Sequence, residues 1–406
     1  MLAPTSHLAL PFFDSTQREL GAALAAWVPQ QQVDEADDRA ACRQWVRLLG
    51  DHGWLRYCVP AAFGGALEKL DSRALVILRE TLAFHSPLAD FAFAMQGLGS
   101  GAITLAGSPE QQATYLGAVA RGDKIAAFAL SEPEAGSDVG AMAMTARFEP
   151  LGSAHPDTVV LDGCKTWISN GGIADYYCVF AKTDVERGTR GISAFVVDAQ
   201  TAGLDSSEHI QVMAPHPLAT LRFTACRIPA SAQLGALNGG FKLAMQTLDI
   251  FRASVAGAAL GMARRALHEA VRYACRRPMF GQRLSDFQLT QAKLGEMAAL
   301  VDAAALLTYR AAWLRDCVGT ATPAQAQAYS AQAAMAKMTA TENAQRVIDM
   351  ALQMHGGLGV KVGTKVESLY RDIRSLRIYE GATEVQQLII GKSVLGSVAH
   401  ASDSKP

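Results

Sequence analysis

The chain has 406 residues, half of them hydrophobic, and a formal net charge of −1 at pH 7. This length predicts two or three domains with a sizeable core. The near-neutral charge offers no electrostatic footprint for nucleic acid, and no apolar stretch stands out as long enough to span a bilayer. We therefore expect no nucleic-acid partner and no membrane insertion.

The seven cysteines are scattered and never form a C-x-x-C pair. This spacing argues against a disulfide framework and a zinc site, and for a reducing compartment. The histidines show no H-E-x-x-H or other metal-binding spacing. The apolar stretch from Met1 to Phe13 has no basic region and no clear cleavage site, so it does not resemble a signal peptide. We expect a cytoplasmic protein without a bound metal.

Residues 1–124 are predicted to form an N-terminal helical domain. Asp14, Ser15 or Thr16 can cap a first helix that runs to Trp27, and Ser108-Pro-Glu-Gln111 is a clear helix start. Two further helices are expected between these signals, over 39–50 and 71–83.

Residues 125–236 are predicted to form a middle β domain. A short apolar run, 125–130, ends in a turn. The β-rich segments that follow are bounded by Gly, Asp and Asn, and they cover 158–163, 176–181, 192–198 and 221–224. Their spacing predicts an antiparallel barrel or sandwich rather than βαβ units.

Residues 237–406 are predicted to form a C-terminal helical bundle. Long Ala-rich helices with short connections are typical of antiparallel bundles. On the first helix, Leu260, Leu267 and Val271 share one face. The expected helices cover 240–275, 286–317, 323–354 and 383–395. The fold class is therefore mainly α with a middle β domain.

Common nucleotide and nucleophile motifs are missing. The glycines at 97–101 and 356–359 do not fit G-x-G-x-x-G after a strand, and no P-loop sequence occurs. The chain also has no G-x-S-x-G elbow. A Rossmann fold, a P-loop and a nucleophilic triad are all disfavoured.

Three other stretches hold polar groups that could bind a ligand. The turn 128–138 could hydrogen-bond a polar heterocycle, and the Trp in 165–172 could pack on a flat ring. The two guanidinium groups in 276–281 could bind phosphate. Each also has an ordinary interpretation: a Pro/Gly turn, a hairpin with a core Trp, and a basic helix C-terminus.

A fourth stretch, 370–387, places a carboxylate just before a helix. Thr383 can cap that helix, and Gln386 completes a capping-box pattern. Glu380 then lies outside the helix N-terminus on a segment loosened by Gly381. Its carboxylate could point into a cleft, or it could only complement the helix dipole.

These motifs occur together in one known family. The order is Leu-Ser-Glu-Pro-Glu-Ala-Gly-Ser-Asp, Lys-Thr-Trp-Ile-Ser-Asn-Gly-Gly, Arg-x-x-Phe-Gly, Gln-x-x-Gly-Gly and Arg-Asp-x-x-x-x-x-Ile-Tyr-Glu-Gly. With them the chain resembles the acyl-CoA dehydrogenases over about residues 14–395. The resemblance implies an N-terminal helical domain, a β-barrel-like middle domain and a C-terminal four-helix bundle.

The resemblance also implies a bound FAD. The residues that match cofactor contacts of the family are Phe128, Leu130, Ser131, Trp167, Ser169, Arg277, Phe280, Gln288, Gln353, Gly356, Gly357, Thr383 and Glu384. Arg277 and Phe280 match a pair that reaches the FAD of a neighbouring subunit. A homo-oligomer, a dimer or a tetramer, is therefore implied.

Glu380 matches the catalytic base of the family, which removes the α-proton of an acyl-CoA while the β-hydride passes to the flavin. Burial would raise the pKa of such a carboxylate toward the working pH. The residues that match substrate contacts or the frame of the site are Ser137, Asp249, Arg252, Tyr379 and Gly381. Arg252 could equally be a salt-bridging helix residue.

One loop and one residue depart from the family pattern. The loop 213–220 contains two prolines where the family often has a Gly-x-Arg-x-Ser-like sequence, and Ala382 stands where Thr is common. His216, in that loop, is a candidate for a group at the edge of the site, but we favour its interpretation as an exposed loop residue.

The resemblance predicts an FAD-dependent acyl-CoA dehydrogenase of fatty acid metabolism that makes a trans-2-enoyl-CoA and passes electrons to an electron-transfer flavoprotein. An acyl-CoA oxidase or a related flavin monooxygenase is the alternative on the same fold. A non-catalytic acyl-CoA or flavin-binding scaffold is a third possibility. The sequence does not give the acyl group.

Overall fold

The computed structural model describes residues 3–149, 157–319 and 322–403. Met1 and Leu2, part of the stretch considered as a signal peptide, lie outside the described residues. The chain forms two compact units. Unit 1 comprises residues 1–32, 71–90 and 249–406, and unit 2 comprises residues 33–70 and 91–248.

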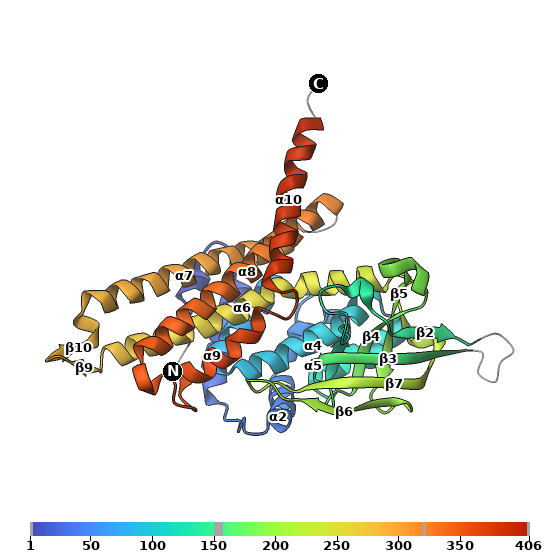
Figure 1. The fold of residues 1–406 in the computed structure, drawn as a ribbon, viewed down its shortest axis with the longest axis horizontal. Coiled ribbons are helices and arrows are strands. Elements are labelled where there is room, and N and C mark those ends of the chain that lie inside the picture. The colour runs from blue at the N-terminus through green and yellow to red at the C-terminus, as the bar shows by residue number, and fades with distance from the viewer. Residues whose placement is uncertain (1–2, 150–156, 320–321, 404–406) are drawn as a thin grey trace. The chain divides into compact units, whose positions relative to one another are not determined.

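Unit 2 is built on one eight-stranded sheet (Figure 1). Its strand order is β6-β7-β3-β2-β4-β5-β8, and β1 pairs with β4. The strands are β1 (Ala126–Ala129), β2 (Thr145–Phe148), β3 (Thr158–Ser169), β4 (Tyr176–Lys182), β5 (Ile192–Asp198), β6 (Leu204–Ile210), β7 (Leu218–Pro229) and β8 (Gln233–Leu234).

The sheet is mixed, which the sequence did not predict. Most pairs are antiparallel, but β1 and β2 both pair parallel to β4. Strand β3 continues six residues past the expected end at Gly163, because Gly163 adopts φ 141° at a register shift and the strand then resumes. Strands β2, β6 and β8 were missed because they are short or polar.

The helices of unit 2 are α2 (Asp38–Asp51), α5 (Pro109–Arg121) and most of α4 (Pro87–Ala106). Helix α5 begins at the predicted signal, where Ser108 and Gln111 form a capping box. Helix α4 packs closely on β1: a Cβ on Gly99 would lie 2.7 Å from backbone atoms of Ala126. The Gln96 amide also donates to the Lys124 carbonyl oxygen and accepts from the Ala126 N–H. This contact fixes β1 and therefore the turn that follows it.

Unit 1 is helical. It contains α1 (Ser15–Trp27), α3 (Ser72–His85), most of α6 (Gly240–Ala274), α7 (Gln288–Trp313), α8 (Pro323–Met354), α9 (Lys365–Leu376) and α10 (Thr383–Asp403). Helices α7 and α8 run side by side, and α10 packs on α8 while its C-terminal end projects away (Figure 1). Helix α9 had no counterpart among the predicted helices.

Alanine and glycine set the packing of α6. Its buried face carries Ala259, Ala263, Ala266 and Ala270 beside Leu260, whereas Val271 is 40% exposed, so the predicted Leu/Val face was partly wrong. Small side chains let backbones approach: a Cβ on Gly261 would lie 2.1 Å from the Glu80 carbonyl oxygen of α3. Helices α3 and α6 therefore meet at backbone contact.

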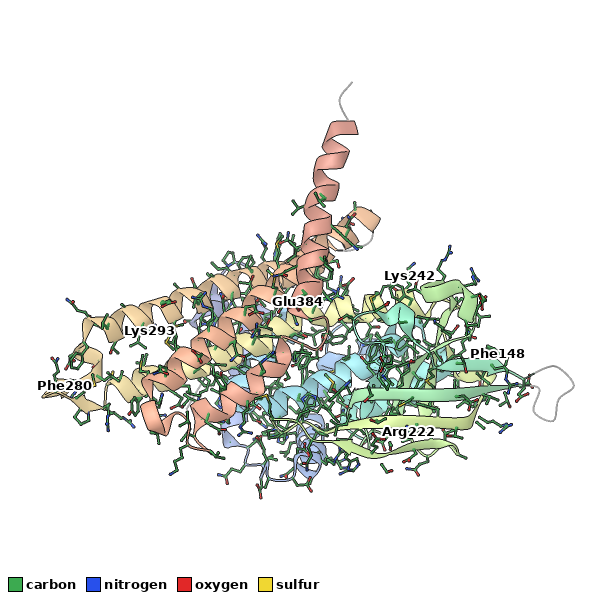
Figure 2. All side chains as sticks on the ribbon, viewed as in Figure 1. Phe148, Arg222, Lys242, Phe280, Lys293 and Glu384 are labelled. Carbon is green, nitrogen blue, oxygen red and sulfur yellow. The ribbon has the colours of Figure 1, made fainter. Side chains whose placement is uncertain are left out.

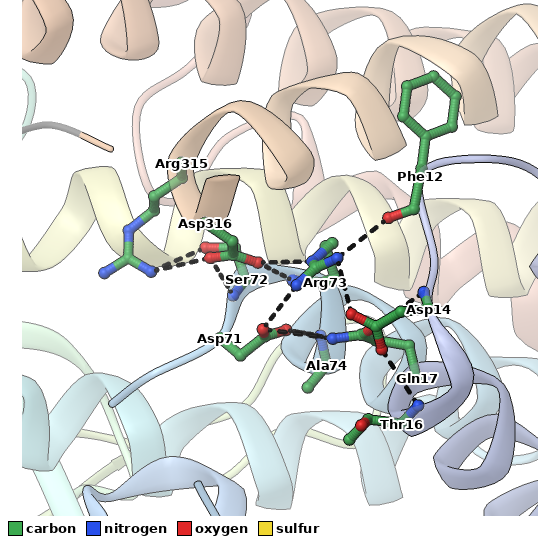
Figure 3. A network of polar contacts seen from close by, with 10 residues as sticks. All are labelled: Phe12, Asp14, Thr16, Gln17, Asp71, Ser72, Arg73, Ala74, Arg315 and Asp316. Carbon is green, nitrogen blue, oxygen red and sulfur yellow. Dashed lines mark hydrogen bonds and ion pairs between the residues drawn. The ribbon is translucent and has the colours of Figure 1, made fainter. Parts of the chain in front are cut away.

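The N-terminus of α3 is held by carboxylates from two directions (Figure 3). Asp71 caps the helix by accepting from the Ala74 N–H at 2.7 Å. Asp316, in the π-helical turn Leu314–Val318, accepts from the N–H groups of Ser72 and Arg73, both at 2.9 Å. Carboxylates at a helix N-terminus satisfy free N–H groups and complement the dipole.

One helical segment among the described residues, Gln288–Val318, is long and apolar enough to cross a membrane by length and composition. The sequence expectation that no such stretch exists is corrected on this point. Core helices of soluble proteins pass the same test, so the finding alone does not indicate a membrane span.

Candidate active site

In unit 2, the turn after β1 is tied to β3. Leu130 and Ser131, both predicted cofactor contacts, follow β1 directly. The Ser131 carbonyl oxygen accepts from the Thr166 N–H at 3.0 Å, and the Leu130 carbonyl oxygen accepts from Lys165 Nζ at 3.0 Å. Two predicted stretches that lie far apart in the sequence are therefore brought together.

A buried ion pair holds this turn. Lys165 Nζ lies 2.7 Å from Glu132 Oε1, and both residues are buried. The Glu132 carboxylate also accepts from the N–H groups of Ala143 and Met144, at 2.6 and 3.1 Å. Burial lowers the pKa of Lys165 to about 8, and Glu132 opposes that shift. Both residues stand in the predicted motifs, but the sequence assigned them no role.

The end of β3 presents an aromatic ring and a hydroxyl. Trp167 adopts φ 59° within an irregular stretch of β3 and is 59% exposed. It is therefore not the core Trp of the alternative interpretation. Phe128 is half-buried on β1, with its ring 4.9 Å from that of Phe180. Ser137 is exposed on the turn that follows.

His216 is not the exposed loop residue that we expected. Its Nε2 lies 3.2 Å from Ser169 Oγ, and its ring centroid is 3.9 Å from that of Phe91. The backbone N–H of His216 donates to Asp38 Oδ2 at 3.0 Å. Burial lowers the pKa of His216 to about 3, so its imidazole is neutral near pH 7. The proline-containing loop thus delivers a neutral imidazole to a predicted cofactor contact.

In unit 1, Glu380 is a partly buried residue in a strained backbone. It has φ 53°, and Gly381 after it has φ 93°. Glu380 Oε2 is buried and has no hydrogen-bond partner among the described residues. Burial raises the pKa of Glu380, and Arg79, Lys337 and Arg252 oppose that rise. A surface residue that only complements a dipole would show none of these features.

The cations around Glu380 come from separate helices. Arg79 of α3 is 2% exposed and donates to both oxygens of Asp90, at 2.8 and 3.0 Å, and to Ser254 Oγ. Arg252 of α6 is buried and pairs with Asp249, whose pKa burial raises. The helix salt bridge we considered for Arg252 is therefore present, and it lies within the Glu380 cluster.

The segment between α9 and α10 corrects the predicted cap. Thr383 is the first residue of α10, and its hydroxyl donates to Glu342 Oε1 of α8 at 2.6 Å. The Gln386 amide donates to the Gly381 carbonyl oxygen at 2.9 Å instead of completing a capping box. Burial raises the pKa of Tyr379, and Glu384 is exposed.

A basic pocket of about 410 Å³ lies at the C-terminal end of α6. Its lining residues include Arg272, Arg276 and Arg277, together with Glu269, which pairs with Arg272 at 3.3 Å. The rings of Tyr273 and His355 stack with centroids 4.3 Å apart on its wall. Arginine forks and an aromatic plane are suited to a phosphate-bearing ligand with a flat ring.

Other predicted cofactor contacts lie near this end of unit 1. Gly356 and Gly357 follow His355 directly, and Gln353 is exposed in the last turn of α8. Phe280 lies between β9 (Pro278–Met279) and β10 (Gln282–Arg283) and is 89% exposed. Figure 2 labels its side chain. Gln288 is exposed at the start of α7. Within the described ranges, no group of His, Cys, Asp and Glu side chains could hold a metal ion.

Three family models match the chain in order. They describe the acyl-CoA dehydrogenase N-terminal domain over residues 15–123, the middle domain over residues 127–226 and the C-terminal domain over residues 238–395. The chain belongs to the acyl-CoA dehydrogenase family. The predicted order of helical, β and helical domains is confirmed with it.

Two curated relatives of this acyl-CoA dehydrogenase family member are named as reductases. A 3-(aryl)acrylate reductase of Clostridium sporogenes is 38% identical over 94% of this chain and 100% of its own length. The caffeyl-CoA reductase–Etf complex subunit CarC of Acetobacterium woodii is 38% identical over 89% of this chain and 93% of its own. A solved acyl-CoA dehydrogenase of Bacillus anthracis complexed with FAD aligns with TM-score 0.85 and 29% identity, over 96% of this chain and 68% of that one.

Members of this family are oxidoreductases that bind FAD, so both expectations are confirmed at that level. The residues present fit such a cofactor in each unit separately. Unit 2 offers an exposed indole and the Ser169 hydroxyl at one strand end. Unit 1 offers a pocket lined by arginines and beside glycines that lack side chains.

Proposed function

We propose that the chain catalyses FAD-dependent oxidoreduction at the α and β carbons of an acyl-CoA thioester, with Glu380 as the base. The observation that carries this proposal is the Glu380 carboxylate itself. It is held in a left-handed backbone, one of its oxygens is buried without a partner, and burial raises its pKa.

The chemistry requires one carboxylate that accepts a proton from a weakly acidic carbon. A base works best when its pKa lies near the working pH, and burial raises the pKa of Glu380 in that direction. FAD supplies the acceptor for the hydride that leaves the β carbon. Gly381 supports this role, because glycine adopts φ 93° without steric cost and leaves room for the Gln386 amide that holds the segment.

The substrate is an acyl-CoA thioester whose acyl group remains to be defined. The names of the two reductases motivate testing aryl-substituted 2-enoyl thioesters as well as saturated acyl-CoAs. In the dehydrogenase direction the product is a trans-2-enoyl-CoA, and in the reductase direction the same groups return the proton and hydride.

Electron-transfer flavoprotein is the proposed redox partner, supported by the Etf complex to which the CarC relative belongs. A homo-oligomer is proposed because Phe280 and Arg277 are exposed at the β9–β10 end of unit 1. Their side chains are accessible there to a second subunit. A reducing, cytoplasmic setting fits the seven cysteines, none of which forms a disulfide in the described part of the chain.

The test is anaerobic bleaching of the flavin absorbance by a panel of saturated and aryl-substituted acyl-CoAs. The Glu380→Gln variant keeps the shape of the side chain but cannot accept the proton, so it should bind FAD and fail to bleach. Glu19→Gln, an exposed residue of α1, is the matched control and should bleach normally. Normal bleaching in Glu380→Gln would refute the role given to Glu380. Peroxide formation in air at the rate of turnover would favour an oxidase instead.

A further inference from the structure

We propose that Lys337 is a positioning residue for Glu380: its ammonium group holds the Glu380-Gly381 backbone and supplies the charge that keeps the Glu380 carboxylate ionised. This inference rests on the proposed role of Glu380 as base. It assigns a task to a residue that the sequence did not single out.

Lys337 is an unusual residue for its place. It stands in the middle of α8, in the run Ala333-Ala-Met-Ala-Lys-Met338, and it is 0% exposed. Lysine is almost never fully buried unless a partner compensates its charge. A buried lysine among small apolar residues therefore calls for a specific partner.

The backbone partner is the residue after Glu380. Lys337 Nζ donates to the Gly381 carbonyl oxygen at 2.7 Å, and Gln386 Nε2 donates to the same oxygen at 2.9 Å. Glu380 and Gly381 have φ of 53° and 93°. A non-glycine residue in this region costs about 1–3 kcal/mol and persists only where its surroundings enforce it. The two donors provide that enforcement.

The electrostatic partner is Glu380. Burial lowers the pKa of Lys337 to about 8, and Glu380 is the group that opposes this shift most. In the reverse sense, Lys337 is one of three cations that oppose the rise in the Glu380 pKa. The two charges therefore stabilise each other within unit 1.

The other charged groups around Glu380 already have closer partners. Arg79 is bound by Asp90, which itself raises the Glu380 pKa, and Arg252 is bound by Asp249. Glu342, on the turn of α8 after Lys337, pairs with Arg377 at 2.8 Å. Among the described residues Lys337 forms no ion pair with any carboxylate, and Glu380 is the carboxylate that acts most strongly on its pKa.

Three variants separate the charge from the backbone contact. Lys337→Gln keeps a polar donor without the charge, and Lys337→Met removes both. Lys337→Arg keeps the charge. Lys293→Gln is the matched control, because Lys293 is exposed on α7 (Figure 2).

The measurement is the pH dependence of kcat/KM for acyl-CoA with an artificial electron acceptor. The acidic limb reports the ionisation of the base in the free enzyme. Loss of a nearby cation should move that limb up by about 1 pH unit in Lys337→Gln and Lys337→Met. It should stay in place in Lys337→Arg and Lys293→Gln. A purely structural role would lower the rate without moving the limb.

The outcomes are distinguishable from failure of the proposed function. If Glu380→Gln bleaches normally, the proposed base is wrong and this inference falls with it. If Glu380→Gln is inactive and the acidic limb of Lys337→Gln coincides with that of the wild type, only the role of Lys337 is overturned. Should Lys337→Met fail to fold, Lys337→Gln decides the matter through the same profile.

Discussion

Lys165 Nζ on β3 lies 2.7 Å from Glu132 Oε1 in the turn after β1, and both side chains are buried. Removing one partner of a buried pair leaves the other charge uncompensated, which typically costs about 3–5 kcal/mol. We expect Lys165→Met and Glu132→Leu each to destabilise unit 2 by about that amount and to loosen the Leu130-Ser131 turn. Urea denaturation and retention of FAD during gel filtration measure the two effects.

The double variant Glu132→Leu, Lys165→Met distinguishes the cost of an unpaired buried charge from the loss of hydrogen bonds to the backbone. With both charges gone, the burial penalty also disappears, so stability should recover relative to either single variant. FAD retention should recover less, because the Leu130 carbonyl oxygen and the N–H groups of Ala143 and Met144 still lose their partners. Additive losses in the double variant would contradict this account.

His216 predicts a pH dependence of stability. Burial holds its folded pKa at about 3, below the ordinary 6.5. A depressed pKa contributes stability that is present above pH 6.5 and is lost as the pH falls toward 3. Between pH 7 and pH 4 this loss amounts to about 3 kcal/mol.

His216→Gln cannot be protonated, so its free energy of unfolding should fall by about 3 kcal/mol less than that of the wild type over this range. Urea denaturation at pH 7, 5.5 and 4 measures the difference. His52→Gln, at the exposed end of α2, is the control and should follow the wild type. Equal slopes for His216→Gln and the wild type would show that His216 is not held neutral.

Local signals in the sequence predicted the fold well where residues close together in the sequence determine the structure of a segment. Asp14, one of the three candidate caps, forms the capping box that begins α1, and the β-rich runs 176–181 and 192–198 became β4 and β5. Helix α9 was missed because it has no side-chain cap at its N-terminus. The Thr364 side chain makes no capping hydrogen bond. The cap at Thr383 failed because Glu342, distant in sequence, takes its hydroxyl.

Long-range contacts limited what could be predicted of the site. The motifs identified Glu380 and the Leu130-Ser131 turn. The sequence analysis assigned no role to Lys337 and Lys165, the residues that hold them. Their signal was present, since Lys337 interrupts an apolar helical run and Arg79 follows Leu75-Val-Ile-Leu78. A charge at a buried helical position indicates a partner, but the sequence does not show which one.

The basic pocket predicts salt-dependent cofactor binding. Arg277 is exposed and lines the pocket with Arg272 and Arg276. If the pocket binds phosphate groups of FAD, Arg277→Ala should weaken FAD binding about tenfold at low salt. The weakening should shrink at high salt, where screening already reduces the contribution of an exposed charge.

Fluorescence titration of the apoprotein with FAD at low and high salt measures this effect. Arg187→Ala, an exposed arginine of unit 2, is the matched control and should bind FAD like the wild type. Because Arg277 is exposed, the thermal stability of the apoprotein should not change. An unchanged FAD affinity in Arg277→Ala would exclude the pocket as a cofactor contact.

Gly381 predicts a strain effect that a second glycine can control. Gly381 has φ 93°, and a Cβ there would lie 2.4 Å from Gln386 Nε2. Gly381→Ala should therefore cost about 1–3 kcal/mol of backbone strain and displace the Gln386 amide from the Gly381 carbonyl oxygen. Since that oxygen also accepts a hydrogen bond from Lys337, we expect kcat to fall more than stability does.

Gly391→Ala is the control. Gly391 lies in α10, where a Cβ meets nothing within 4 Å, so the variant should stabilise the helix by up to about 1 kcal/mol without changing kcat. Steady-state kinetics and thermal denaturation of the two variants test this, and equal kcat values would refute the link between the Gly381 backbone and the base.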